Sequence, residues 1–324
     1  MNIFKKMKVA ILFVIVAALF IGCSNSDASS DETVNYPEKD ITLTVPFNPG
    51  GASDMHTRVL EKYFEDEFGH SLSFVYKPGA AGAVGTAEVA AMQGEDHTIL
   101  AANYPDIIIQ PLTESGNFSI DDFDYIAEVT NNPLLLATGG DSDITTLDDF
   151  VDQAKANPGE MSVAYAPNSV LHIAMLDFMD QAEIDVTLVP YKDGPEAKSM
   201  IMGGHVDAAI LNLSLVAEEL DKINSLAVTT DEDLDELDIQ SFTSQGYDVI
   251  AELSRIYLAP KGLSDEQLTI LRDGFNNIGQ NENYIEDMEK TEQPVEWLTG
   301  DELEAKVREY NDYAKQIIEK HGLN

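Results

Sequence analysis

Two glycine-rich segments are the residues of this sequence best suited to hold a ligand. The first runs from Pro46 to Asp54 (PFNPGGASD) and the second from Lys77 to Gly85 (KPGAAGAVG). Glycine lets backbone amides approach a ligand closely, and a helix that begins just after such a turn favours a negative group there. The segments therefore predict that main-chain N–H groups bind an anion. Taken singly, each could equally be a tight turn in which Ser53 or Asp54 caps a helix; two loops of one design are harder to explain that way.

Each segment lies between a predicted strand and a predicted helix. Strands are expected at 41–45 and 72–76, and helices at 53–68 and 86–92, from the spacing of their apolar residues. The pattern continues with strands at 97–102, 134–137, 162–165, 186–189, 206–211 and 226–228, and with helices at 147–156, 169–180, 196–202, 264–277 and 301–320. The last helix carries an apolar stripe that predicts a buried face: Leu303, Val307, Tyr310, Ala314 and Ile317. Strands separated by helices predict an α/β fold with mainly parallel sheets, which bind ligands at the carboxyl ends of their strands.

Acidic residues dominate the composition. The chain has 58 Asp and Glu against 19 Lys and Arg, a formal net charge of −39, which excludes nucleic-acid binding because phosphates require clustered cations. A hydrophobic fraction of 44% indicates a folded chain, and 324 residues favour two domains. The four arginines are Arg58, Arg255, Arg272 and Arg308. An anionic ligand must therefore rely on few cationic side chains, and the spacing of Asp54 and Arg58 predicts a local ion pair between them.

The amino terminus has the form of an export signal. Three lysines precede an apolar run, Val9 to Ile21, which ends at Gly22 and Cys23. Cys23 is the only cysteine, so the chain can form no internal disulfide, and the segment resembles a bacterial lipoprotein signal. We expect removal of residues 1–22, lipidation of Cys23 and a flexible tether over residues 23–36; the alternative is an ordinary cleaved signal with an incidental cysteine. Removal of the signal takes three lysines and no acid, which leaves a charge of −42, an acidity that we interpret as adaptation to salt.

No pattern in the sequence indicates catalysis, a cofactor or a metal. It contains no GxSxG, Walker or HExxH motif, and the second loop reads GxxGxxG rather than the GxGxxG of dinucleotide-binding proteins. The acidic stretch 231–238 lacks the ligand spacing of a calcium loop and is interpreted as solvated surface. Six histidines occur without metal-ligand spacing: His56, His70, His97, His172, His205 and His321.

Four segments resemble the substrate-binding proteins of tripartite tricarboxylate transporters, the TctC or Bug family. They are YPEKDITLTVPFNPGGASDMHTRVL from Tyr36, VYKPGAAGAVGTAEVA from Val75, VPYKDGPEAKSMIMGGHVDAAILN from Val189 and LAPKGLSDEQLTILRDGF from Leu258. Together they span nearly all of the mature chain in the family's order. The sequence departs from the family at Ala81, which replaces a glycine, at GEDHTIL, which replaces Pro-Asp-Gly-Tyr-Thr-Leu, and at Asp193-Gly194, which replaces Gly-Ser.

The resemblance implies a two-domain clamshell of the periplasmic binding protein type II class, each domain built on a mainly parallel sheet flanked by helices. Residues 37–130 and 253–324 would form domain 1, and residues 131–252 would form domain 2. The chain would cross between the domains at 131–133 and 253–256, because a hinge needs only a few residues.

The resemblance also implies a set of ligand-binding residues. In family members the two glycine-rich loops hold a carboxylate through amides and ordered waters. By position, the implied contacts are Phe47, Asn48, Gly50, Gly51, Ser53 and Asp54 in the first loop, Ala80, Ala81, Gly82 and Val84 in the second, and Asn168, Ser169, His172, Tyr191, Lys192 and Asn212 in domain 2. His172 could equally be a packed helix residue, and Asp54 would repel an anion unless a water, a hydroxyl or an ammonium group lay between them.

The function expected from these features is capture of a small carboxylate outside the membrane. A monomeric, lipid-anchored bacterial protein would bind a dicarboxylate, a tricarboxylate or a related organic acid and deliver it to the large and small membrane subunits of a tripartite tricarboxylate transporter. Its own contact with the membrane would be through the lipid alone. The alternative is a sensor subunit that signals to a membrane kinase; a hydrolase would lack a nucleophile and a base. The sequence does not identify the acid.

Overall fold

The computed structural model describes residues 34–50, 52–113, 115–290 and 295–323. The predicted signal, Cys23 and most of the predicted tether lie outside the described residues, as does Gly51. The chain from Tyr36 to Asn324 forms one compact unit. Within the described residues, no helix combines the length and the apolar character needed to cross a membrane.

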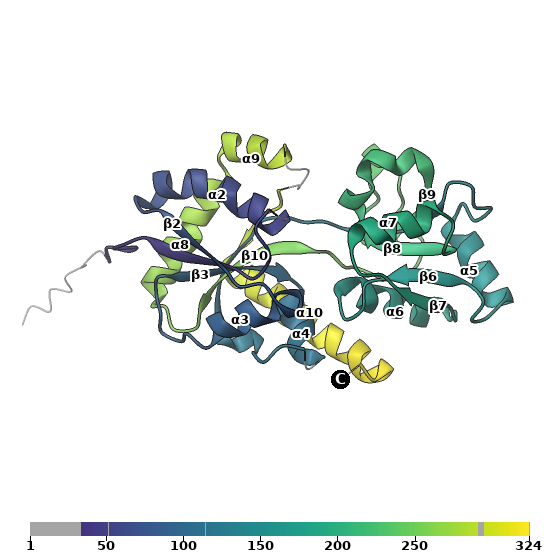
Figure 1. The fold of residues 1–324 in the computed structure, drawn as a ribbon, viewed down its shortest axis with the longest axis horizontal. Helices are drawn as coiled ribbons and strands as arrows, with labels where there is room; N and C mark the ends of the chain where they lie inside the picture. The colour runs from purple at the N-terminus through teal and green to yellow at the C-terminus, as the bar shows by residue number, and fades with distance from the viewer. Residues whose placement is uncertain (1–33, 51, 114, 291–294, 324) are drawn as a thin grey trace, which may run out of the picture. The chain divides into compact units, whose positions relative to one another are not determined.

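The first sheet has six strands in the order β11-β4-β10-β3-β1-β2 (Figure 1). These are β1 (Ile41–Val45), β2 (Leu72–Tyr76), β3 (Thr98–Tyr104), β4 (Phe123–Glu128), β10 (Ser254–Pro260) and β11 (Leu298–Thr299). One face packs against α2 (Ala52–Phe68), α8 (Asp265–Gly279) and α9 (Glu282–Glu289), and the other against α3 (Ala83–Ala90), α4 (Asp106–Leu112) and α10 (Gly300–His321). Successive side chains of β3 and β10 point to opposite faces and belong to two separate hydrophobic cores, as expected for a sheet that is covered on both sides.

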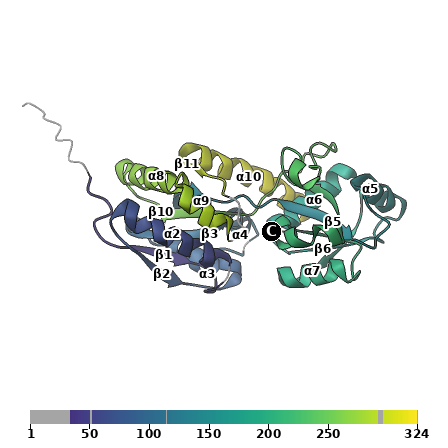
Figure 2. The same ribbon diagram turned by 90° about the horizontal axis from the view of Figure 1, so that it is seen from above.

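The second sheet has five strands in the order β7-β6-β8-β5-β9. These are β5 (Leu134–Gly139), β6 (Ser162–Tyr165), β7 (Thr187–Pro190), β8 (Ala208–Asn212) and β9 (Ile223–Val228). Helices α5 (Leu147–Ala156) and α6 (Val170–Ala182) cover one face, and α7 (Gly194–Met202) covers the other (Figure 2). Short 3-10 helices complete the chain: η1 (Ala80–Gly82), η2 (Ile120–Asp122), η3 (Leu213–Leu215), η4 (Ala217–Lys222) and η5 (Asp235–Leu237).

The predicted α/β class is confirmed, but both sheets are mixed rather than mainly parallel. Strand β10 is antiparallel to β3 and β4, and β5 is antiparallel to β8 and β9. Both strands enter their sheet directly from the other sheet. Ser254, at the start of β10, lies opposite Tyr104 at the end of β3, and Leu134, at the start of β5, lies opposite Asn212 at the end of β8. A strand that enters at the edge where its neighbour ends must run in the opposite direction.

Two adjacent segments carry the chain between the sheets. Pro133 forms an antiparallel bridge with Glu252, and Leu253 N donates to Asn132 O at 3.0 Å. The return crossing is shorter than predicted, because Ser254 already belongs to β10. The division into residues 37–130 with 253–324 and residues 131–252 stays a prediction.

The last helix also contacts the second sheet's helices. The predicted stripe of α10 is buried, as expected. Towards its end, Tyr313 OH donates to Asp177 Oδ2 of α6 at 2.7 Å, and Lys320 Nζ lies 2.6 Å from Asp180 Oδ2. Helix α10 therefore links the two sheets in addition to the crossing segments.

Candidate functional site

Both glycine-rich loops lie at one edge of the first sheet. Strands β1 and β2 are parallel and in register, with Val45 opposite Tyr76, so the loops that follow them leave the sheet side by side. Helix α2 begins after the first loop and α3 after the second. The sequence prediction that these two loops share a position relative to their strands is confirmed. Their main-chain N–H groups and two helix amino termini therefore lie at the carboxyl edge of the sheet.

Asp54 organises the first loop from within. Its Oδ2 accepts the N–H of Gly50 at 2.7 Å, and its Oδ1 accepts Tyr76 OH at 2.5 Å and lies 3.1 Å from Arg58 Nε. Burial alone would raise the pKa of this carboxyl, but the hydrogen bonds from Tyr76, Gly50 and Arg58 together lower the pKa below its ordinary value. The predicted ion pair with Arg58 is confirmed. The charge of Asp54 is thus compensated inside the protein.

The two loops pack against each other at Gly82. This residue has a φ of 99°, and a Cβ added there would lie 3.1 Å from Cζ of Phe47. Ala80 and Ala81 also have positive φ, at 47° and 52°, and the carbonyl of Ala81 accepts the side-chain N–H of Gln110 at 2.9 Å. The second loop is thereby held in a conformation that L-residues seldom adopt.

Most of the implied contacts in the two loops are open to solvent. Asn48, Gly50, Ala80, Ala81 and Val84 are exposed. Phe47 is half-buried, whereas Ser53 and Asp54 are buried.

The implied residues of the second sheet also lie at one edge. Strands β6, β7 and β8 are parallel, with Tyr165 opposite Pro190, so the loops after β6 and β7 and the end of β8 come together. Asn168, which is exposed, has a φ of 52° and donates its N–H to Nδ1 of His172 at 3.4 Å. Ser169 caps α6 at its amino end, and its Oγ donates to Ala166 O at 2.8 Å.

His172 is buried, and its ring centre lies 4.6 Å from that of Tyr165. Burial first, and then the proximity of His321, lower the pKa of His172 to about 4, so its ring is neutral at pH 7. A neutral ring that accepts a hydrogen bond at Nδ1 carries its proton on Nε2. This residue can therefore offer a neutral donor, not a cation.

The other three implied residues of this edge have distinct environments. Tyr191 OH donates to Ile210 O at 3.3 Å, and burial raises the pKa of this hydroxyl well above its ordinary value. Lys192 is exposed, and its backbone N–H donates to Glu196 Oε2 at 2.7 Å. Asn212 is half-buried, and its Oδ1 is buried without a hydrogen-bond partner in the described structure.

The edges of the two sheets that carry these residues are the ones joined by the crossing segments. The chain leaves the first sheet at the end of β4, which runs parallel to β3, and enters the second sheet beside the end of β8. The structure therefore assembles the implied residues into two groups, one at each carboxyl edge. It also identifies two supports that the sequence did not predict, Tyr76 and Gln110, which hold the first and second loop. The position of Tyr76 at the end of the predicted strand before the second loop could have indicated its role. No pattern in the sequence singles out Gln110.

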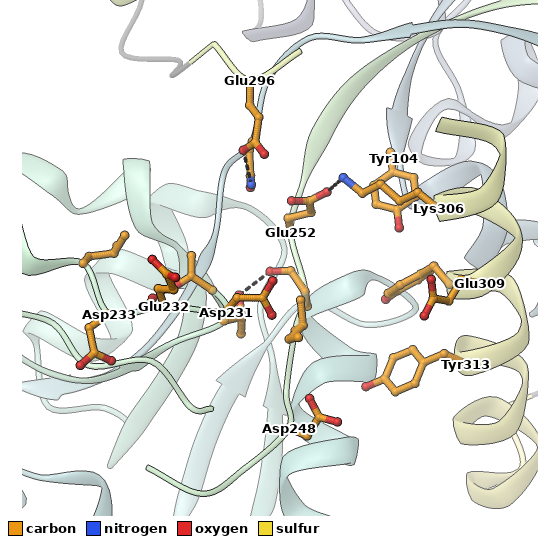
Figure 3. A pocket seen from close by; sticks show the side chains of 17 residues that line it. Tyr104, Asp231, Glu232, Asp233, Asp248, Glu252, Glu296, Lys306, Glu309 and Tyr313 are labelled. Carbon is orange, nitrogen blue, oxygen red and sulfur yellow. Dashed lines mark hydrogen bonds and ion pairs between the residues drawn. The ribbon is translucent and has the colours of Figure 1, made fainter. Parts of the chain in front are cut away.

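A separate cavity of about 870 Å³ contains none of the implied residues (Figure 3). Its labelled lining comprises Tyr104, Asp231, Glu232, Asp233, Asp248, Glu252, Glu296, Lys306, Glu309 and Tyr313. Lys306 is already paired with Glu128 and Glu252, and burial is the main cause that raises the pKa of Glu252, to about 7. The cavity is therefore strongly acidic and unsuited to an anion. The acidic stretch 231–238 is largely exposed, as its interpretation as solvated surface expected, and its first residues also line this cavity.

One group of potential metal ligands occurs among the described residues: Glu95, Asp96 and His97. Asp96 Oδ1 lies 2.6 Å from His97 Nδ1, and Asp96 Oδ2 accepts Gln267 Nε2 at 2.9 Å. These groups are already paired with one another and with the adjacent helix.

Two mixed α/β sheets joined by paired crossing segments, with loops gathered at the edges where the chain crosses, are the fold of the periplasmic binding proteins of type II. Residues 57–323 match the family described as the tripartite tricarboxylate transporter family receptor, TctC, and the chain belongs to this family. The protein BugT of Bordetella pertussis is 27% identical over 259 residues, which is 78% of this chain and 79% of that protein.

Solved structures show the same fold. A TctC solute-binding protein from Polaromonas superposes with a TM-score of 0.80 at 22% identity, covering 88% of this chain and 99% of that chain. An R. palustris protein whose structure contains adipate superposes with a TM-score of 0.71 at 20% identity, covering 89% of this chain and 98% of that chain. The expected family and fold are thereby confirmed.

Proposed function

We propose that this chain captures a small carboxylate between the two carboxyl edges and delivers it to membrane subunits of a tripartite tricarboxylate transporter. The observation that carries the proposal is the internal compensation of Asp54, the only acid of the two glycine-rich loops. These loops consequently present N–H groups and helix amino termini, and their one lysine, Lys77, is paired with Glu88. The cavity of about 870 Å³, by contrast, is acidic. The adipate bound to a protein of the same fold supports a dicarboxylate or a related acid as the ligand.

The proposed binding residues come from both edges. The N–H groups of Gly50 and Gly82 already donate to Asp54 Oδ2 and Gly79 O, so other backbone N–H groups of the two loops would bind one carboxylate. Hydrogen bonds to an ionised group are stronger than neutral ones. The side-chain amide of Asn168, the backbone N–H of Ser169 and the Nε2 of His172 would approach the ligand from the second sheet as neutral donors, because the Ser169 hydroxyl already donates to Ala166 O. Closure about the crossing segments would sequester the ligand and join the two domains in one surface for the transporter.

A thermal-shift screen of the purified protein tests the binding step. The panel holds adipate, malate, citrate, glutamate and benzoate, with calcium and spermidine as cations. A ligand at 100 times its Kd stabilises the folded state by about 2.7 kcal/mol, which is a shift of several degrees. We expect at least one acid to raise the melting temperature; a response to the cations alone would point to the acidic cavity and contradict the proposal.

Transport requires a test in cells. Deletion of the gene should abolish uptake of the acid found in the screen, and the protein should return that acid chemically unchanged. Uptake that continues while a transcriptional response to the acid disappears would favour a sensor. We further propose that Cys23, outside the described residues, anchors the protein to the outer face of the cell membrane.

A further inference from the structure

Arg255 lies at the candidate edge of the first sheet, although at least 170 residues separate it from the glycine-rich loops in the sequence. It follows the first residue of β10 and pairs with Asn103, next to the last residue of β3. Its Nη1 donates to Asn103 Oδ1 at 2.6 Å, and its backbone N–H donates to Thr130 Oγ1 at 2.9 Å. The side chain retains some solvent-accessible surface, while its Nε is buried without a hydrogen-bond partner in the described structure. The Nε–H of Arg255 is therefore an unused donor.

The charge of Arg255 is also unpaired. Arg58, Arg272 and Arg308 each lie within 4 Å of a carboxylate oxygen, of Asp54, Asp301 and Asp121 respectively. No such ion pair is found for Arg255 in the residues that the structure describes. A largely buried cation without an ion pair is costly, and a ligand anion bound to it would offset that cost.

The neighbours of Arg255 do not replace this anion. His56 lies in α2, and burial first, then the charge of Arg255, lower its pKa to about 3, so it is neutral. Asp106 attracts Arg255 electrostatically but forms no ion pair with it within 4 Å; Asn103 connects the two, and its Nδ2 donates to Asp106 Oδ2 at 3.2 Å. Burial raises the pKa of Asp106 to about 6 against the opposing effects of Asn103 and Arg255, so this carboxyl is a poor counter-ion in mildly acidic solution.

Along the direction of the strands, Arg255 lies at about the same height as the start of α2. Tyr257 OH lies 2.9 Å from His56 Nδ1, and Arg255 is on the same face of β10, two residues or about 6.8 Å nearer the edge. Helix α2 runs back along the sheet, so the first helical residue, Ala52, lies about 6 Å nearer the edge than His56. The guanidinium and the start of α2 thus lie at a similar level along the strands, with β3 between β10 and β1.

We propose that Arg255 binds a carboxylate group of the ligand, with Asn103 as the residue that positions its guanidinium. This inference rests on the proposed function and identifies Arg255 as the positively charged side chain of the proposed carboxylate site. The fork of Nη1 and Nη2 suits a planar carboxylate, which the main-chain N–H groups of the first loop would approach from the other side. Asp106 weakens the site by repulsion when it is ionised.

Calorimetry on substituted proteins tests the assignment. The probe is whichever of adipate, malate, citrate, glutamate and benzoate stabilises the parent most. Loss of a hydrogen-bonded charge should weaken binding by Arg255→Gln about 10- to 100-fold. Asp106→Asn should preserve or strengthen binding, because it removes a negative charge near Arg255. Arg272→Gln is the matched control, since this half-buried arginine of the same sheet's helix α8 is already paired and should leave affinity unchanged.

Melting temperatures separate a binding role from a structural one. Because Arg255 forms no ion pair within 4 Å among the described residues and has only a longer-range attraction to Asp106, Arg255→Gln should melt close to the parent temperature while its affinity falls. Arg255→Lys, which keeps the charge but loses the fork, decides the question if the Gln variant does not fold, and it should bind several-fold more weakly than the parent. Affinities of the Arg255 variants within threefold of the parent would overturn this inference alone. A parent that binds none of the five acids would overturn the inference and the proposed function together.

Discussion

Replacement of Asp54 by Asn should loosen the first loop and destabilise the protein. The carboxylate is 5% exposed and receives hydrogen bonds from Gly50 N, Tyr76 OH and Arg58 Nε. Asparagine has one acceptor oxygen, so its amide nitrogen must face either Gly50 N–H or the Tyr76 and Arg58 donors. At least one hydrogen bond to a charged group is therefore lost, each contributing about 1.5 to 3 kcal/mol. We expect a loss of about 2 to 4 kcal/mol in the free energy of unfolding.

The assay is denaturant unfolding at pH 7 and at pH 3, with Glu61→Gln as the control. Glu61 lies 3.9 Å from the same arginine, but its side chain is 43% exposed, so its removal should change stability by less than about 0.5 kcal/mol. The pKa of Asp54 is lower in the folded protein than its ordinary value of 3.8. Its stabilisation is therefore complete above pH 3.8 and is lost as the pH falls through the lower, folded-state pKa. The difference between Asp54→Asn and the parent should shrink in acid; a loss below 1 kcal/mol at pH 7 would refute this account of the loop.

Three further results are expected. Raising NaCl from 0.1 to 1 M shortens the screening length from about 10 to about 3 Å, so the strongly acidic protein should unfold at a higher temperature; a flat or falling midpoint would show that its acidity is unrelated to salt. Cys23→Ser should release the protein from the membrane fraction, as judged by immunoblotting, and continued retention would exclude the lipid anchor. Burial raises the folded-state pKa of Asp106 from 3.8 to about 6, so its contribution to stability falls as the pH rises between these values, by about 1 to 3 kcal/mol. Asp106→Asn should abolish this loss of stability, as judged by melting temperatures measured from pH 4 to 7. The same pH dependence of the melting temperature in parent and variant would contradict this expectation.

Local patterns made much of the fold predictable. The glycine-rich loops, the helix that follows the first of them and the strand at 162–165 depend on neighbours in the sequence, and each was found where expected. Strand β4 escaped prediction because two acids interrupt its apolar pattern. Asp124 and Glu128 are nevertheless buried, since Lys261 and Lys306 pair with them from distant parts of the chain. Helix α4 escaped because its isoleucine triplet resembles a strand and Pro111 lies within the helix.

Contacts between distant segments account for what the sequence did not reveal at the site. The pairing of Arg255 with Asn103 joins positions 152 residues apart, and it depends on β10 returning antiparallel beside β3. The expectation of mainly parallel sheets gave no reason to place Arg255 near the loops. The link from Gln110 to the carbonyl of Ala81 likewise requires α4, which the sequence did not predict. The Asp54–Arg58 pair was predictable because both residues lie on one face of the same helix.

Recognition of a carboxylate group is tested most directly by calorimetric titration of the purified protein with the acid that the thermal-shift panel selects and with the neutral amide of that acid. The two ligands have nearly the same size and shape, so their difference isolates the charge. We expect the acid to bind with one site per chain and the amide to bind about 10- to 100-fold more weakly, because the hydrogen bonds from the loops and from Arg255 lose their ionised acceptor. Equal affinity for acid and amide would contradict carboxylate recognition.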